Sequence, residues 1–249
     1  MSISIAFLNN IFNLKKLQLP TRYYHFKDNE NYIKLLSIGE GIFPKDKIKT
    51  NILLENSNSI FTTESATKIY PSKKEYGINS INISLENSNL EFINDELILY
   101  KDSKLLQFLK IKADDKSTFF YGDILSDGRS NENFDFTSMR AKNSFYIDMD
   151  IEYLEKFDVQ GKELKNYIED NSSQNELFAK VYIKTMNNGD FLNKLIENDF
   201  TSFSYTSKQN MIIGVLSDSN MAKLKTKVKT VWSLYRKFLG KKEFDLGKQ

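Results

Sequence analysis

The pentapeptide Leu-Glu-Asn-Ser-Asn occurs twice in the chain, at Leu54–Asn58 and again at Leu85–Asn89, 31 residues further on. Apolar residues alternate with polar ones on both sides of each copy, and this period of two is typical of strands with one buried face. Asn and Ser accept the backbone dihedral angles of tight turns. Each copy therefore predicts a strand, a polar turn and a returning strand.

A third, diverged copy of this layout follows about 28 residues after the second. Leu109 and Ile111 lead into the turn sequence Ala-Asp-Asp-Lys-Ser at 113–117, and Phe119 and Tyr121 lead out of it. A β unit that recurs at this spacing favours layers stacked along an axis, each burying its apolar face on the next. Chance in an Asn- and Lys-rich chain is the alternative, but the flanking alternation recurs as well. We expect the three turns on one side of the assembly: Asn56–Asn58, Asn87–Asn89 and Asp114–Lys116.

The expected fold class is mainly β, with solenoid-like stacked layers and mostly antiparallel strands. The character of the sequence changes after about Gly161, where helical spacing of apolar residues begins to appear. No linker separates the two parts. We therefore expect one domain, β-rich over residues 1–160 with an α/β tail over residues 161–249.

Within the tail, residues 190–198 predict a short helix with Asp190 as its cap, and two short strands are expected at 202–206 and 211–216. A longer helix is predicted near 219–239. Its apolar residues recur at intervals of three and four and form one stripe: Met221, Leu224, Val228, Val231, Tyr235 and Phe238. Ser217 and Asp218 are candidate N-caps of this helix, and Gly240 is its expected stop.

The last helix and the residues after it carry many cations without an intervening acid: Lys223, Lys225, Lys227, Lys229, Arg236, Lys237, Lys241 and Lys242. At 100° per residue the first six fall outside the apolar arc, so we expect them on the solvent face. They serve either solubility and the helix C-terminus or docking to an acidic protein surface. No groove-reading motif accompanies them, so no nucleic-acid partner is expected.

The composition narrows the classes of function. A chain of 249 residues can bury a sizeable core, and its net charge of +2 carries no general signal for nucleic acid. The absence of cysteine excludes disulfides and thiolate metal sites, and the single histidine excludes multi-histidine metal sites. That histidine, His25, lies among aromatic residues and is expected to pack rather than to act as a base or ligand.

The N-terminal residues Met1–Asn13 are apolar but lack a basic leader and are interrupted by asparagines, so we expect strands rather than a signal peptide. No apolar run reaches the ~18 residues that a membrane span requires. The expected location is the cytoplasm, without a membrane partner.

The chain shows no nucleophile elbow, no phosphate-binding loop and no dinucleotide fingerprint. Five acids in the β-rich part are expected to be solvated or to cap turns: Glu91, Asp95, Glu96, Asp123 and Asp127. A protein without enzymatic activity fits this pattern best. A carbohydrate-active enzyme that uses paired carboxylates on a β-solenoid, and a freestanding β interaction module, are the alternatives.

One hydroxyl-rich stretch, Phe-Thr-Thr-Glu-Ser-Ala-Thr-Lys-Ile-Tyr at 61–70, resembles the T-T-Q-x-A-T-K-x-Y stretch of the urease accessory protein UreD family, also called UreH. The resemblance continues through Leu90–Tyr100, similar to the family's L-E-[WF]-x-x-[QD]-[DE]-x-I segment, and through Tyr121–Arg129, similar to its acid-x-x-x-x-G-R segment. It extends to Val215–Gly240, which resembles the family's C-terminal helix with its x-W-x-x-x-R end. Together these matches run in order over about residues 39–240.

The chain departs from the family pattern at several places. Its glycine element at Gly39–Asp46 keeps only the aspartate, Glu64 replaces the glutamine of T-T-Q, and Gly214 stands where many members have arginine.

The resemblance implies a mostly β accessory protein that binds apo-urease and UreF- and UreG-like partners and supports nickel delivery to the urease site. It implies no tightly bound cofactor, with nickel at most in transit. The residues that match the family motifs, as partner-binding or structural positions, are Thr62, Thr63, Thr67, Lys68, Tyr70, Glu91, Glu96, Asp123, Gly128, Arg129, Trp232 and Arg236. Asp46 and Glu132 align with family acids implicated in nickel passage. Oxygen ligands alone would hold Ni²⁺ weakly, as transfer requires.

Overall fold

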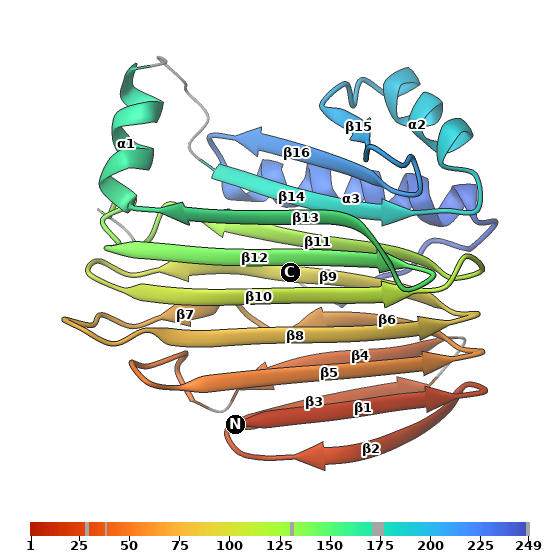
Figure 1. Ribbon diagram of the computed structural model, residues 1–249, viewed down its shortest axis with the longest axis horizontal. Coiled ribbons are helices and arrows are strands. Elements are labelled where there is room, and N and C mark those ends of the chain that lie inside the picture. The colour runs from red at the N-terminus through yellow and green to blue at the C-terminus, as the bar shows by residue number, and fades with distance from the viewer. Residues whose placement is uncertain (28–29, 38, 130–131, 171–176, 248–249) are drawn as a thin grey trace.

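The chain forms two β sheets that stack face to face, with helices at one end of the stack (Figure 1). This computed structural model describes residues 1–27, 30–37, 39–129, 132–170 and 177–247. Sheet A contains β1 (Ser2–Leu8), β2 (Ile11–Leu17), β5 (Lys47–Glu55), β8 (Gly77–Glu86), β10 (Lys104–Ala113), β12 (Ser138–Ile147) and β13 (Asp150–Val159). Sheet B contains β3 (Thr21–Lys27), β4 (Asn31–Ser37), β6 (Asn58–Thr63), β7 (Thr67–Ile69), β9 (Asn89–Leu99), β11 (Thr118–Ser126), β14 (Leu177–Lys184), β15 (Phe203–Tyr205) and β16 (Ile212–Asp218). The helices are α1 (Gly161–Asp170), α2 (Asn188–Glu197) and α3 (Met221–Phe238).

Strand direction is parallel through the middle of both sheets and antiparallel at their ends. β1, β5, β8, β10 and β12 are parallel neighbours in sheet A, as are β4, β6, β9 and β11 in sheet B. Antiparallel pairs, such as β1–β2, β12–β13 and β11–β14, flank these runs. The stacked, mainly β architecture is confirmed, but the expected antiparallel majority is corrected to a mixed arrangement. The turns after β5, β8 and β10 each carry the chain from sheet A to sheet B, so equivalent strands of successive layers run the same way.

The Leu-Glu-Asn-Ser-Asn repeat builds these crossing turns. Asn56 and Asn87 adopt positive φ angles of 46° and 44°, which asparagine tolerates better than most residues. The hydroxyl of Ser57 donates to Glu55 O at 2.7 Å, and the hydroxyl of Ser88 repeats this bond to Glu86 O at 2.7 Å. The two copies are therefore equivalent in structure as well as in sequence.

Successive turns bond directly to one another along the stack. The amide of Ser57 donates to Ser88 Oγ at 3.0 Å, and the amide of Ser88 donates to Ser117 Oγ at 3.1 Å. Asn87 N donates to Asp114 Oδ2 at 2.8 Å, which joins the second copy to the diverged third one. The prediction that the three turns share one side is confirmed, and Figure 1 shows them at the right-hand ends of β5, β8 and β10.

The main core lies between the sheets. In sheet A, Ile5, Ile52, Ile83 and Ile111 are register partners along the stack, and Phe145 continues the row. All five side chains are buried. β-branched residues pack well on a pleated surface. Isoleucine at the same register position of successive strands therefore occupies an equivalent place in each layer of the core.

A second core lies on the outer face of sheet B, beneath α2 and α3. Phe120 of β11 meets Val228 and Tyr235 of α3 and Phe191 of α2 in one buried cluster. β14, β15 and β16 continue sheet B past β11, so the tail and the β-rich part share a sheet.

The tail matches most of its predicted elements, with different caps. α2 and α3 cover the helices expected near 190–198 and 219–239, and β15 and β16 match the two expected strands. Asn220, not Ser217 or Asp218, caps α3, since its side chain accepts from Lys223 N at 3.1 Å. Gly240 ends that helix as expected, with φ of +69°.

Two features of the helices depart from expectation. Asn187 caps α2, and Asp190 donates its amide to Asn187 Oδ1 at 3.1 Å instead of acting as the cap. α1 was not predicted. It begins at Gly161, where an added Cβ would lie 1.8 Å from Phe134 O, so only glycine allows this close approach.

Candidate functional site

The residues singled out from the sequence lie in four places: a buried charge cluster under α3, the hydroxyl-rich stretch, the interior between the sheets, and the loops opposite the stacked turns.

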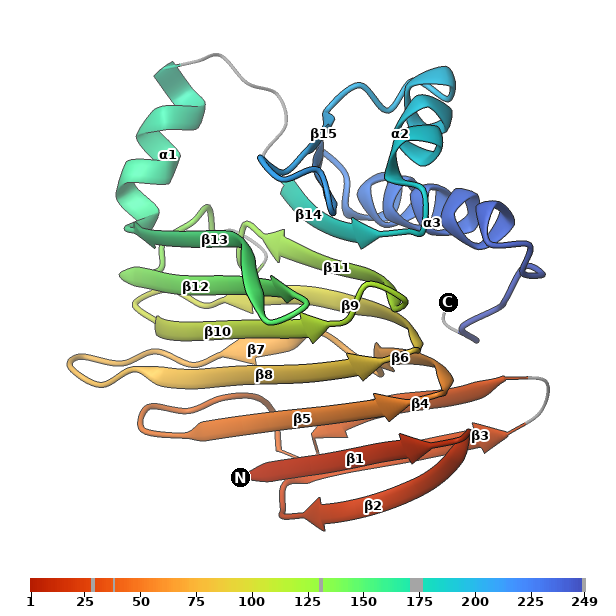
Figure 2. The ribbon, with the colours of Figure 1, turned by 45° about the vertical axis from the view of Figure 1, so that its right-hand side comes forward.

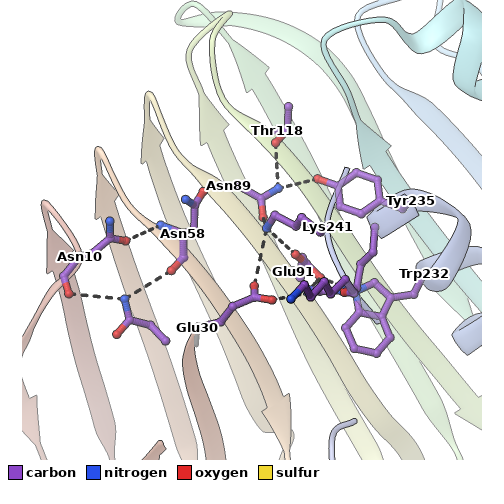
Figure 3. Close-up of polar contacts among 12 residues, drawn as sticks. Asn10, Glu30, Asn58, Asn89, Glu91, Thr118, Trp232, Tyr235 and Lys241 are labelled. Atoms are coloured by element: carbon purple, nitrogen blue, oxygen red, sulfur yellow. Dashed lines mark hydrogen bonds and ion pairs between the residues drawn. The ribbon is translucent and has the colours of Figure 1, made fainter. Parts of the chain in front are cut away.

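Glu91 is the centre of the charge cluster under α3 (Figure 3). Its side chain is fully buried on the outer face of β9, so the expectation that this acid is solvated or caps a turn is wrong. Its carboxylate accepts from Trp232 Nε1 at 2.6 Å, Arg236 Nη1 at 2.6 Å and Lys241 Nζ at 2.7 Å. Arg236 also pairs with Glu30, so two cations face two carboxylates.

The charge cluster holds α3 against sheet B. Burial lowers the pKa of Arg236, but Glu91 and Glu30 outweigh it and raise that pKa, so the guanidinium stays charged. Arg236 is 1% exposed. It was expected on the solvent face and is instead buried, a correction to the sequence-based assignment. Arg236 lies about one helical turn after Trp232 and about two turns after Val228, so it is on the face of α3 that packs on the sheet.

Amide side chains extend this cluster along the turns (Figure 3). Asn89 donates to Thr118 Oγ1 at 2.8 Å and to Tyr235 OH at 2.8 Å, and it accepts from Lys241. Asn58 N donates to Asn10 Oδ1 at 2.9 Å one layer further along the stack. The asparagines of the repeat thus pair the turns and also anchor the C-terminal helix.

The segment after α3 folds back over β4 (Figure 2). Tyr32 OH donates to Leu246 O at 2.7 Å, and the Phe244 ring packs edge-on against Tyr32 at 5.1 Å. Leu246 is buried. This contact ties the end of the described chain to the first layers of sheet B.

The hydroxyl-rich stretch is buried at Phe61, Thr62 and Ile69, exposed at Glu64 and Ser65, and half-buried elsewhere. Thr62 Oγ1 donates to Ile93 O at 2.6 Å, and Thr63 Oγ1 accepts from Asp95 N at 2.8 Å. Thr63, Thr67 and Lys68 line a cavity of about 190 Å³ between the sheets. The stretch thus joins neighbouring strands and borders an internal space.

Asp123 lies between the sheets beside this cavity. Its carboxylate accepts from Asn94 Nδ2 at 2.9 Å, Tyr121 OH at 3.2 Å and Gln107 Nε2 at 3.2 Å. Burial raises the pKa of Asp123 to about 6. Asn94 also lines the cavity of the hydroxyl-rich stretch, so one side chain connects the two places.

A second cavity, of about 100 Å³, lies on the other side of Asp123 and is lined by Gln107, Asn143 and Tyr182. Gln107 Oε1 and Asn143 Oδ1 are buried there without a hydrogen-bond partner among the described atoms. Tyr182 OH donates to Glu155 Oε2 at 2.8 Å. The interior therefore offers several oxygen atoms that can accept a hydrogen bond or bind a cation.

No sequence motif pointed to this interior group: Gln107, Asn143, Glu155, Lys180 and Tyr182. One signal could have found part of it. Gln107 stands between Leu105 and Leu109 on the face of β10 that alternation assigns to the core. An amide at such a position requires a polar partner inside.

The loops opposite the turns hold the remaining residues. Arg129 donates from Nη2 at 2.8 Å and from Nε at 3.0 Å to one carboxylate oxygen of Glu132, Oε1, and its guanidinium lies 4.2 Å from the Tyr100 ring centre. Tyr70 packs edge-on against Tyr100 at 5.2 Å. Gly128 has φ of +128°. Glu132 is thus held by the loop that Gly128 and Arg129 form, and this pairing lowers the pKa of its carboxyl against the opposing effect of burial.

Asp46 lies in the loop before β5. Its carboxylate accepts from Phe43 N at 3.0 Å, and the Phe43 ring stacks on Tyr70 at 4.2 Å. The structure therefore places both predicted metal-path acids in loops on this side, each with a local partner.

The acid Glu96 and half of the cations near α3 form internal ion pairs. Lys225 Nζ lies 2.6 Å from Glu96 and 3.6 Å from Asp95, and Lys227 Nζ lies 2.9 Å from Asp218. With Arg236 and Lys241 in the charge cluster, this basic run serves mainly to attach the helix.

Comparison with known proteins assigns the chain to a family. A sequence model described as UreD urease accessory protein matches residues 16–246. The chain belongs to the UreD family. It is 63% identical over 250 residues to the urease accessory protein UreD of Aliarcobacter butzleri, and this match covers 100% of both chains. The UreD of Staphylococcus epidermidis is 32% identical over 143 residues, 56% of this chain and 51% of that one. The UreD of Bacillus sp. strain TB-90 is 30% identical over 119 residues, 46% and 44% of the two chains.

UreD proteins are accessory proteins of urease and not enzymes, so the chain has a role in urease maturation. The resemblance inferred from its motifs is confirmed, and the carbohydrate-active alternative is set aside. None of the helices in the described ranges has the length and apolar character of a membrane span.

Proposed function

We propose that this chain binds apo-urease together with UreF- and UreG-like partners in the cytoplasm, and that the complex delivers nickel to the urease active site. The observation that carries the proposal is family membership over residues 16–246, joined to full-length identity of 63% with a urease accessory protein. The rigid stack of bonded turns suits a scaffold, because it fixes the distance between partner surfaces on different layers.

We further propose that nickel, as cargo, passes between the sheets near Asp123. The two cavities on either side of Asp123 support this route, since Asn94 borders one and bonds to the carboxylate facing the other. Unpartnered oxygens of Gln107 and Asn143 would replace part of the hydration shell of a passing ion.

The chemistry of these ligands favours transit over storage. Ni²⁺ prefers imidazole and thiolate ligands, whereas this interior supplies carboxylate, amide and phenol oxygens. No cluster of three acidic, histidine or cysteine side chains that could hold a metal occurs in the described ranges. An ion would therefore bind weakly and leave again, and because burial raises the pKa of Asp123 to about 6, protons compete with the ion for this carboxylate as the pH falls toward 6.

Asp46 and Glu132 remain proposed for the outer part of the route. Because Arg129 offsets the charge of Glu132, we assign the larger effect on nickel transfer to Asp123. In cells with the whole urease cluster, Asp123→Ala should lower the nickel content of urease more than the double substitution of Asp46 and Glu132 by alanine. Equal nickel content in the wild type and both variants would remove the route through this chain.

The partner proposal is tested by affinity purification of the tagged chain from cells that express the urease structural and accessory genes. We expect apo-urease and UreF- and UreG-like proteins in the eluate. Recovery of none of them, with folded bait, would contradict the proposed function.

A further inference from the structure

The outer face of sheet A is a broad surface that the helices leave uncovered. Figure 1 shows this face toward the viewer, with α2 and α3 at the upper end of the stack and α1 beyond the end of β13. The packing agrees, since α2 and α3 bury their apolar side chains in the cluster on sheet B. Alternation along β10, β12 and β13 sends every second side chain to this outer face.

Lysine dominates the charge on this face where β10, β12 and β13 lie side by side. Lys110, Lys112, Lys142 and Lys156 belong to this set, and none forms an ion pair with a described acid. The one acid–base pair there joins Arg140 to Asp158 at 2.8 Å and is neutral overall. The chain as a whole carries only +2, so the positive charge on this face is a local concentration.

Two of these lysines face each other directly. Lys142 of β12 and Lys156 of β13 are register partners, and both side chains are exposed. Like charges opposite each other on adjacent strands destabilise a sheet. The acid nearest along β13 on this face, Asp158, is already paired with Arg140, so a lysine pair that costs stability is left to find its compensating charge on another molecule.

Apolar side chains lie among the lysines. Phe108 is 40% exposed and is the register partner of Lys142, while Ile151 and Leu154 of β13 are 50% and 44% exposed. Lys110 Nζ lies 5.0 Å from the centre of the Tyr146 ring. A surface that mixes exposed aliphatic and aromatic groups with cations fits the core and rim of a protein interface.

We propose that the outer face of β10, β12 and β13 docks an acidic protein surface within the urease maturation complex. This inference rests on the proposed function and adds the chemistry of one partner surface to it. A nucleic acid is the less suitable occupant, since the aliphatic Ile151 and Leu154 would be buried against phosphate, and the Tyr146 ring is already covered by Lys110.

The lysines of α3 provide a matched comparison. Lys223, Lys229 and Lys237 are exposed and form no ion pair with a described acid, but they lie on the opposite side of the molecule, over sheet B. They carry the same charge without the flat apolar surroundings. Reversal of three charges there controls for general loss of positive charge.

The experiment compares three tagged proteins, each purified from cells that express the whole urease cluster: the wild type, Lys110→Glu/Lys142→Glu/Lys156→Glu, and Lys223→Glu/Lys229→Glu/Lys237→Glu. Circular dichroism and thermal unfolding establish that each is folded. We expect the sheet A variant to lose at least one urease-cluster protein by about tenfold or more, because juxtaposed like charges cost several kcal/mol in an interface. The α3 variant should retain it, and the wild-type complex should weaken when salt rises from about 0.1 M to about 0.5 M.

Retention of every partner by the sheet A variant would overturn the inference and leave the proposed function intact. Equal loss by both variants would also overturn it, since the effect would then follow total charge. A wild type that recovers no urease-cluster protein would contradict the proposed function itself, and this inference with it. A labelled single-stranded oligonucleotide serves as a second probe, and binding that the sheet A variant alone loses, with all proteins retained, would assign the face to nucleic acid instead.

Discussion

Replacing Arg236 by methionine should destabilise the protein strongly, because it leaves a buried carboxylate with one cation fewer. Glu91 is fully buried, and in the variant only Trp232 and Lys241 remain bonded to it. Breaking a buried ion pair from one side costs about 3–5 kcal/mol. Lys241 stays in contact with Glu91, so we expect the lower end, about 3 kcal/mol.

The size of this loss is large against the total stability of a domain, typically about 5–15 kcal/mol. For a chain of this length it corresponds to a fall in Tm of roughly 6–12 °C. Urea unfolding followed by tryptophan fluorescence suits the assay, since Trp232 is the only tryptophan and lies in the cluster. The double variant with Glu91→Gln should recover part of the loss, because it removes the stranded charge as well.

Arg140→Met provides the matched control. Arg140 also pairs with a carboxylate at 2.8 Å, but its side chain and that of Asp158 are 56% and 55% exposed. Exposed pairs contribute about 0–1 kcal/mol. A loss for Arg236→Met within about 1 kcal/mol of that for Arg140→Met would refute the view that this buried cluster fastens α3.

Three further outcomes follow from the structure. Burial raises the pKa of Asp123 from its ordinary 3.8 to about 6, so between these values the folded state holds a proton that the unfolded state has released. The free energy of unfolding of the wild type, measured by urea titration at each pH, should therefore fall by roughly 2–3 kcal/mol relative to Asp123→Asn as the pH rises from about 4 to about 6. Lys156→Glu should turn the repulsion with Lys142 into attraction and raise the free energy of unfolding by roughly 0.2–1 kcal/mol, and an unchanged or lower value would remove the cost assigned to that pair. Ser88→Ala should cost about 1–3 kcal/mol, since it leaves the amide of Ser57 without its acceptor inside the turn ladder, and a neutral result would show that the bonded ladder contributes little.

The sequence predicts those parts of the fold that local patterns determine. The turns are encoded by the residues that occupy them, because asparagine tolerates the positive φ that the turn requires and the serine hydroxyl bonds to the backbone within the same turn. The α3 stripe and the Gly240 stop are likewise local. Strand direction is not determined by local patterns, since a strand–turn–strand pattern fits both a hairpin within one sheet and a crossing between two sheets. Bonds from each turn to the next layer decide between them.

The candidate site is less visible in sequence, because its residues meet only through the sheet stacking. Asp123 and Gln107 come from opposite sheets, and their contact depends on the register of both. Arg236 was misplaced for another reason. The predicted apolar stripe did not include Trp232, so the arc that it defined excluded Arg236, although residues four apart share one helical face. A buried carboxylate on another strand, Glu91, offsets the cost of burying that charge.

Nickel content of urease is the quantity that this proposed function must change. Urease would be purified from cells that carry the structural and accessory genes, with and without the gene for this chain, and its nickel per active site measured by elemental analysis. We predict equal amounts of urease protein from both strains, low nickel without this chain, and nickel restored when the gene is supplied from a plasmid. Fully loaded urease from cells without it, at the same limiting nickel supply, would contradict a role of this chain in nickel delivery.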